Sequence, residues 1–347
     1  MRPSRRKLLK YVGAIAFPMI SSIAATVFVG ASVTLLSFAP AYAAEVTMRV
    51  NHTFGVNSFP DRALQEFKKQ VEAKSNKRIE VRLYSSGELG QEIEQYDLMQ
   101  TGSLEAALMG GQVLSSVAPE YGMFEAPYLW RDQAHLRKVW DGAIGKEISD
   151  ALLSRKGIRI VGVFNRGARN LTTTSKVVKA PQDLGGLKIR TTQNPVHVAA
   201  WKALGALPTP MAFGEVFMGL RQGVIDGQEN PLDLIQSASF FEVQKNLHLT
   251  QHVRSIGWFG VSEGWFKRVP DDLKKVILAE ARSAMLLNDR TLAAEEDKIL
   301  KDLAKRMNVV REQDMDITAF RARMKTLPQE FAKTWKKGLY EQIVNTK

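Results

Sequence analysis

Hydrophobic residues recur first with the period of a strand and then with that of a helix, and this change repeats along the chain. Residues 45–53 (EVTMRVNHT) alternate as a strand does, whereas apolar side chains in residues 58–75 (SFPDRALQEFKKQVEAKS) recur every three or four positions. A strand (RIEVRLYSS), a turn with a helix start (GELGQE) and a strand-like segment (LEAALMG) follow. This order predicts a largely parallel sheet.

A second block of strands and helices begins near residue 158. IRIVGVFN (158–165) is strand-like, RGAR predicts a turn, and LKIR (187–190) predicts a short strand. Two helices follow (NPVHVAAWKALG and FGEVFMGLRQG), and then another strand region (LHLTQHVRSIGWFGVS). No low-complexity linker separates the blocks, so the pattern predicts an α/β protein built from two similar parts.

A single long helix is predicted near the C-terminus. Residues 270–307 keep a helical apolar period without an interior glycine or proline. At 1.5 Å per residue such a helix reaches roughly 55 Å, which exceeds the expected width of either block. We therefore expect it to span both.

The first 43 residues have the composition of an export signal. Basic residues (Arg2, Arg5, Arg6, Lys7 and Lys10) precede an uncharged run that closes on PAYAA, with small residues where signal peptidase requires them. SRRKLLK also fits the twin-arginine consensus, which would mean export in the folded state. The alternative is an uncleaved membrane anchor, since about 28 apolar residues suffice to span a bilayer.

Charge and cysteine content narrow the class of protein. The formal charge is +12, and removal of the five basic signal residues leaves 43 − 36 = +7. A charge of this size suggests attraction for anions, and nucleic-acid binding is not implied for an exported protein. The absence of cysteine excludes disulfides, cysteine-ligated zinc and a thiol nucleophile. A soluble periplasmic protein is expected.

Arg190 is the main candidate for chemistry. It ends the strand LKIR, and ligands of open α/β sheets bind outside the carboxyl ends of strands. A guanidinium suits a carboxylate because two parallel N–H···O bonds form at once. The alternative is a surface arginine that caps the strand. Arg169, in FNRGARNLTT, lies at a comparable strand end, and Arg166 could play the same part.

Other polar motifs have weaker support. Asp226 and Glu229 in DGQENP are possible acid–base partners of an exported α/β hydrolase, although the segment also fits a helix-ending turn. His248 and His252 have the spacing of a helical metal site, but their segment alternates as a strand. GELGQE lacks the lysine of a P-loop. We therefore predict no catalytic residue, metal or cofactor.

Residues 186–232 (GLKIRTTQNPVHVAAWKALGALPTPMAFGEVFMGLRQGVIDGQENPL) resemble the solute-binding proteins of tripartite ATP-independent periplasmic (TRAP) transporters, of the dicarboxylate- and sialic-acid-binding type. The similarity extends over the chain after the signal. It implies a two-domain periplasmic binding protein fold, in which each domain is a mostly parallel sheet flanked by helices and a long helix spans both. It also implies a small organic acid as ligand, small and large membrane subunits as partners, and no catalysis. A partner of a sensor kinase or chemoreceptor is the alternative.

The resemblance implies domain limits and site residues. The domains would comprise 44–166 with about 255–294, and 167–254 with about 295–347. The implied ligand-binding residues are Arg190 as the carboxylate-binding arginine, Arg169 as a second arginine, the aromatic Phe213, and Asn230, with Gln193 and Glu92 at two further positions. Gly110 stands where the sialic-acid branch has a glutamate, and Gln193 where it has an asparagine. These differences favour a sugar acid or hydroxy acid over sialic acid.

Overall fold

Two long antiparallel strands run through the middle of the fold. β4 (Ile158–Thr173) and β8 (Asn246–Ser262) pair along most of their length, from Ile158 opposite Ser262 to Thr173 opposite Asn246. This computed structural model describes residues 44–347, so the expected export signal and its twin-arginine motif lie outside the described residues. Within residues 44–347, no helix combines the length and the apolar character needed to span a membrane.

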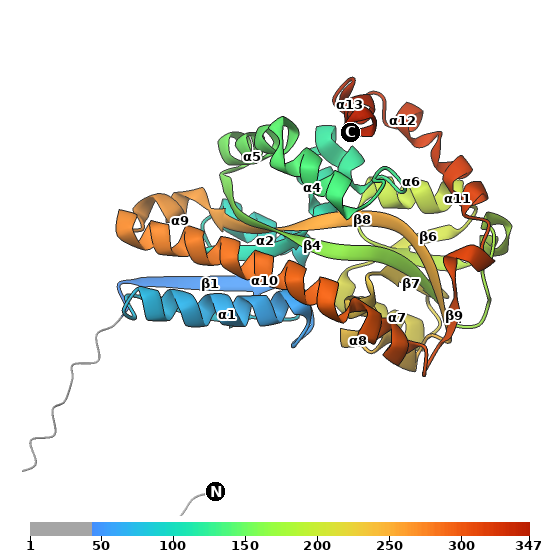
Figure 1. The fold of residues 1–347 in the computed structure, drawn as a ribbon, viewed down its shortest axis with the longest axis horizontal. Helices are drawn as coiled ribbons and strands as arrows, with labels where there is room; N and C mark the ends of the chain where they lie inside the picture. Colours follow the sequence, from blue (N-terminus) through green and yellow to red (C-terminus); the bar gives the residue numbers. More distant parts are fainter. Residues whose placement is uncertain (1–43) are drawn as a thin grey trace, which may run out of the picture. The chain divides into compact units, whose positions relative to one another are not determined.

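The first group of parallel strands lies on one side of this pair. β1 (Val46–His52) is parallel to both β2 (Ile79–Tyr84) and β3 (Ala106–Gly110), and β3 joins the C-terminal half of β8. The connecting helices are α1 (Phe59–Lys74) and α2 (Glu92–Gln100), as the apolar spacing predicts. Figure 1 shows this group in blue and cyan.

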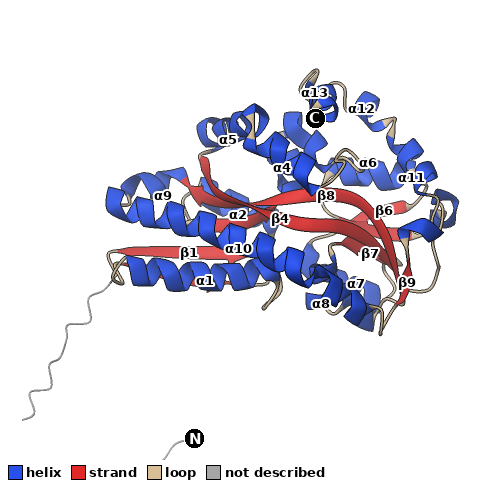
Figure 2. Ribbon diagram, viewed as in Figure 1, coloured by secondary structure: helices blue, strands red, loops and turns tan. Residues whose placement is uncertain are grey.

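The second group of parallel strands joins β4. β5 (Lys188–Thr191) is parallel to β6 (Leu207–Pro210) and β7 (Gly227–Asn230), and β7 is antiparallel to β4. Its helices are α6 (Pro195–Ala203), α7 (Val216–Arg221) and α8 (Leu232–Ser237). The strand order is β2-β1-β3-β8-β4-β7-β5-β6, and β9 (Asn308–Val310) pairs with β8. Figure 2 shows helices on either side of this sheet.

The segment RGAR is part of β4, so the predicted turn was wrong. The register of β4 against β8 advances from Asn165–Ile256 to Ala168–Arg254, which inserts one extra residue into β4. Gly167 takes up the bulge with φ of 76°. The extra residue interrupts the regular alternation of side chains between the two faces of β4 at this point. The helix-ending turn considered for DGQENP is likewise corrected, because Gly227–Asn230 is strand β7.

The long helix predicted near the C-terminus is α10 (Asp271–Leu303). Its 33 residues extend about 50 Å at 1.5 Å per residue. Ala281 and Met285 pack in the apolar core beside α1, and Leu292 and Leu303 pack in the core beside α8 and the start of β8. The helix therefore joins the two strand groups, as predicted, and lies along both in Figure 1.

The remaining helices cover the upper part of the view in Figure 1. They are α3 (Leu114–Val117), α4 (Gln133–Asp141), α5 (Ala143–Lys156), α11 (Ile317–Met324), α12 (Leu327–Glu330) and α13 (Leu339–Asn345), while α9 (Glu263–Arg268) leads into α10. His135 Nε2 lies 3.0 Å from the carbonyl of Ile343, and Phe320 shares a core with Trp201 of α6. The C-terminal segment is thus fixed against both α4 and α6.

Candidate functional site

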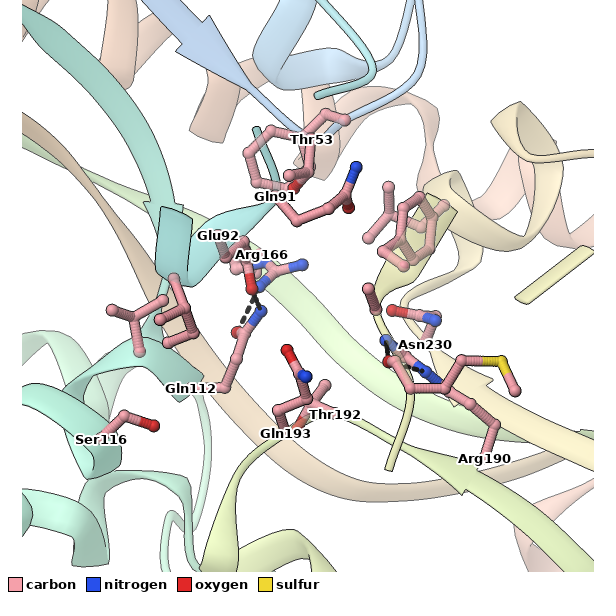
Figure 3. Close-up of a pocket in the computed structure, with 17 residues that line it drawn as sticks. Thr53, Gln91, Glu92, Gln112, Ser116, Arg166, Arg190, Thr192, Gln193 and Asn230 are labelled. Atoms are coloured by element: carbon pink, nitrogen blue, oxygen red, sulfur yellow. Dashed lines mark hydrogen bonds between the residues drawn. The ribbon is translucent and has the colours of Figure 1, made fainter. Parts of the chain in front are cut away.

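A cavity lies between the two strand groups. It encloses about 560 Å³, its open mouth included, and side chains from both groups line it. Thr53, Glu92 and Gln112 come from the first group, and Arg190, Gln193 and Asn230 come from the second. Figure 3 shows these side chains around a common space. A cleft of this size with a few convergent polar groups is typical of a small-molecule site.

Arg190 forms one end of this cavity. The residue lies on β5 and is 3% exposed. The neighbouring parallel strand β6 leads to Met211, whose carbonyl accepts hydrogen bonds from Arg190 Nε (3.0 Å) and Nη2 (2.7 Å). Within residues 44–347, Nη1 has no hydrogen-bond partner. Desolvation by burial lowers the pKa of Arg190 to about 10, so the guanidinium is still charged at neutral pH. The site therefore holds a buried cation to which no carboxylate of the described residues is bound.

Three other residues named from the sequence lie beside Arg190. Asn230, at the end of β7, is buried and lines the cavity, while Gln193 is exposed at its rim. Phe213 is half-buried and packs edge-on against Phe240, with ring centroids 6.0 Å apart. The wall around Arg190 thus offers an amide, a second amide and an aromatic face.

Arg169 does not line the cavity and lies in a buried network next to it. Its side chain is 1% exposed, and Nη2 donates to Glu229 Oε1 at 2.8 Å, while Nε also donates to the same carboxylate. Nη2 lies 3.0 Å from Asn230 Oδ1 as well. Arg169 therefore contacts Asn230, which lines the cavity, but the guanidinium of Arg169 does not itself line it.

The ion pair between Arg169 and Glu229 keeps both side chains charged in this buried network. Burial alone would raise the pKa of Glu229, but Arg169 and His252 outweigh it and hold that pKa well below its usual range. Burial alone would lower the pKa of Arg169, and the ion pair raises it instead. Desolvation lowers the pKa of His252, whose Nε2 lies 3.1 Å from Glu229 Oε2. Glu229 is thus an ionised partner of Arg169, and it has no proton with which to act as a general acid near neutral pH.

A second polar cluster forms the opposite end of the cavity. Arg166 Nη1 donates to Gln112 Oε1 at 2.7 Å, and Gln112 Nε2 donates to Glu92 Oε2. Glu92 Oε1 also accepts from the backbone N–H of Gly110 at 3.0 Å. Figure 3 shows these three side chains joined by dashed lines, across the cavity from Arg190. The family resemblance predicted Glu92 as a ligand contact, and the sequence offered Arg166 as an alternative to Arg169. No sequence feature indicated Gln112.

The other sequence motifs lie outside this arrangement. His248 Nε2 accepts from the N–H of Val178 at 2.9 Å, and Asp226 Oδ2 accepts from the N–H of Lys188 at 2.8 Å, so both support local backbone. Among residues 44–347, no group of three or more histidine or acidic side chains is placed to hold a metal ion.

Comparison with known proteins gives one consistent result. The profile of the family described as "Bacterial extracellular solute-binding protein, family 7" matches residues 50–334. A solute-binding protein of Verminephrobacter eiseniae is 38% identical over 305 residues, which cover 87% of this chain and 89% of that protein.

Two solved structures show the same fold with small acids bound. A TRAP periplasmic solute-binding protein of Roseobacter denitrificans with bound L-galactonate is 32% identical, with a TM-score of 0.80 over 86% of this chain and 99% of that one. Another from Polaromonas sp. JS666, bound to D-erythronate, is 32% identical with a TM-score of 0.82, covering 87% and 99%. The likeness therefore extends over essentially all the described residues.

Proposed function

This chain belongs to family 7 of the bacterial extracellular solute-binding proteins, and from this premise we propose that it captures a sugar acid for a TRAP transporter. Its relatives are periplasmic substrate-binding proteins that bind small organic acids and work with membrane subunits. For this chain we propose delivery to the small and large membrane subunits, and export by the twin-arginine route.

The main support for the proposal is the surroundings of Arg190. A buried guanidinium costs free energy unless an anion compensates it. The carbonyl of Met211 fixes the orientation of Arg190 without neutralising it, and Nη1 has no partner within residues 44–347. A ligand carboxylate bound across Nη1 and Nη2 would supply the missing charge with two parallel hydrogen bonds.

Closure of the cleft would couple capture to delivery. We propose the two domains as 44–166 with about 255–294, and 167–254 with about 295–347, moving about the strands β4 and β8 that connect them. Because Glu92 and Arg190 reach the cavity from different strand groups, a ligand that contacts both stabilises the closed form by those extra contacts. Closure would then be recognised by the membrane subunits.

We propose that the chain is no enzyme. Asp226 supports the backbone of Lys188, and Glu229 is paired with Arg169 in a buried network. Neither carboxylate lines the cavity. Asn230, Phe213 and Gln193 are proposed as ligand contacts, and Arg169 as the residue that positions Asn230.

A thermal-shift screen tests the function. The purified protein is heated with three-carbon to six-carbon hydroxy acids, aldonates, uronates and dicarboxylates, and with the matching alditols, which lack the carboxylate. Ligand at 100 times its Kd stabilises the native state by about 2.7 kcal/mol, which raises the Tm by several degrees. We expect a shift with at least one acid and none with its alditol. Equal shifts with acid and alditol, or no shift with any acid, would contradict the proposal.

A further inference from the structure

The geometry points to a second subsite, formed by Arg166, Gln112 and Glu92, that binds the hydroxyl groups of the ligand's tail and selects polyhydroxy monocarboxylates over dicarboxylates of equal length. This inference rests on the proposed function, because it assumes that a carboxylate binds at Arg190. It assigns a role to Arg166 and Gln112, which face Arg190 across the cavity.

The three side chains are held in place by one another and by the backbone. Arg166 donates to Gln112 at 2.7 Å, Gln112 donates to Glu92, and Glu92 accepts from the N–H of Gly110. The carbonyl of Gln112 accepts from Asn194 Nδ2 at 3.0 Å, and the guanidinium of Arg166 lies 5.1 Å from the ring centre of Phe54. A polar cluster fixed in this way is preorganised for a ligand.

Gly110 makes room for this cluster. A Cβ atom at residue 110 would lie 1.9 Å from Arg166 Nη1 and 2.1 Å from Gln112 Oε1. The backbone of Gly110 has φ of −75°, which any residue adopts, so the glycine is required by the neighbouring side chains and not by its own conformation. Arg166 can therefore occupy this end of the cavity only because residue 110 has no side chain.

The charges differ between the two ends of the cavity. Arg169 is neutralised by Glu229. Glu92, Glu125 and Asp233 place negative charge around Arg166 without an ion pair to it among residues 44–347, whereas Arg190 in the same range has no carboxylate bound to it. One ligand carboxylate balances Arg190, but a second carboxylate at the Arg166 end would face Glu92, and like charges this close in a buried site repel strongly.

Hydroxyl groups match the Arg166 end better than a carboxylate does. Arg166 offers N–H donors, and Glu92 offers carboxylate acceptors, on the same side of the cavity. A hydroxyl group both donates and accepts, so it can bond to both residues at once, whereas a carboxylate can only accept. The ligand class that satisfies both ends is therefore an acid with one carboxylate and a hydroxylated tail.

Isothermal titration calorimetry on the purified protein tests this preference. Hexonates of different stereochemistry are titrated first, and the tightest is compared with the aldarate made by oxidising its terminal carbon and with hexanoate. We expect the aldonate to bind at least tenfold more tightly than either. If the aldarate binds as tightly as the aldonate, the inference is wrong while the proposed function stands. If none of these or the screened acids binds, the proposed function itself fails.

Two variants test the subsite at Arg166 independently of the carboxylate-binding end at Arg190. Arg166→Gln removes the cation, and Gly110→Ala displaces it by steric contact. Both should weaken aldonate binding roughly 10- to 100-fold, the range for one charge-assisted hydrogen bond, and change lactate binding less than twofold. Gly264→Ala is the matched control for Gly110→Ala, because its Cβ meets nothing closer than 4.0 Å, and it should leave both affinities unchanged.

The variants also distinguish binding from folding. A variant is folded if its Tm without ligand lies within a few degrees of that of the parent protein. If Gly110→Ala does not fold, Arg166→Gln alone tests the inference. Unchanged aldonate affinity in a folded Arg166→Gln protein would overturn the inference. Equal losses for aldonate and lactate would also overturn it, because they would place Arg166 at the carboxylate and not at the tail.

Discussion

Arg190 and Arg169 are both almost fully buried, yet their surroundings differ in one respect. Arg169 is bound on two nitrogens by the carboxylate of Glu229, whereas Arg190 is bound by the neutral carbonyl of Met211. The pKa of Arg169 is accordingly raised by its ion pair, and that of Arg190 is lowered by burial. Burial of an arginine therefore does not identify a ligand site. We propose the ligand site at Arg190, and not at Arg169, because Arg190 has no compensating carboxylate within the described residues.

Replacing Arg190 should have the largest effect on ligand binding. Arg190→Ala leaves the ligand carboxylate buried without its partner, which costs roughly 3–5 kcal/mol, or about a hundredfold to several thousandfold in Kd. Arg190→Lys should also bind poorly, since an ammonium cannot form the two parallel bonds. Calorimetry with the best acid from the screen measures both. Affinities within threefold of the parent protein would remove Arg190 from the site.

Breaking the Arg169–Glu229 pair should act on stability instead. Glu229→Gln leaves Arg169 as an uncompensated buried cation, so we expect the free energy of unfolding to fall by about 3 kcal/mol or more. Asp226→Asn is the matched control, since that carboxylate lies in the same segment and accepts one exposed hydrogen bond from the backbone, and it should cost about 1 kcal/mol or less. Urea unfolding compares them. Equal losses in the two variants would show that the pair has no special role.

A smaller effect is expected from pH through Asp233, behind Arg166. Burial raises the pKa of Asp233 to about 6 from 3.8, with Glu296 raising it further and Arg166 opposing the shift. The folded state then binds a proton more tightly than the unfolded state, so Asp233 makes the protein less stable as pH rises from about 4 to 6.

The contribution of Asp233 can be isolated by substitution. Between pH 5 and pH 7.5, Asp233 should lower the free energy of unfolding by about 1 kcal/mol, and Asp233→Asn should remove that change. Urea unfolding of both proteins at the two pH values gives the difference, in which other titrating groups cancel. An identical pH dependence in the two proteins would show that Asp233 does not titrate in this range.

The sequence pattern determined most of the elements. The long helix at 271–303, the strands around 46–52 and 79–84, and the carboxyl-end position of Arg190 all follow from local periodicity. Such patterns report which face of an element is buried, and they depend on neighbours within a few residues. The family resemblance then indicated Phe213, Asn230 and Glu92, which line the cavity.

The role of each charged side chain, by contrast, was decided only by the tertiary structure. The pattern RGAR predicts a turn, and the bulged pairing of β4 with β8 makes it part of a strand that carries Arg166 into the cavity. Glu229 lies 60 residues from Arg169, and Gln112 lies 54 residues from Arg166. Whether a buried charge is compensated depends on partners that are distant in sequence, because desolvation and pairing act through space.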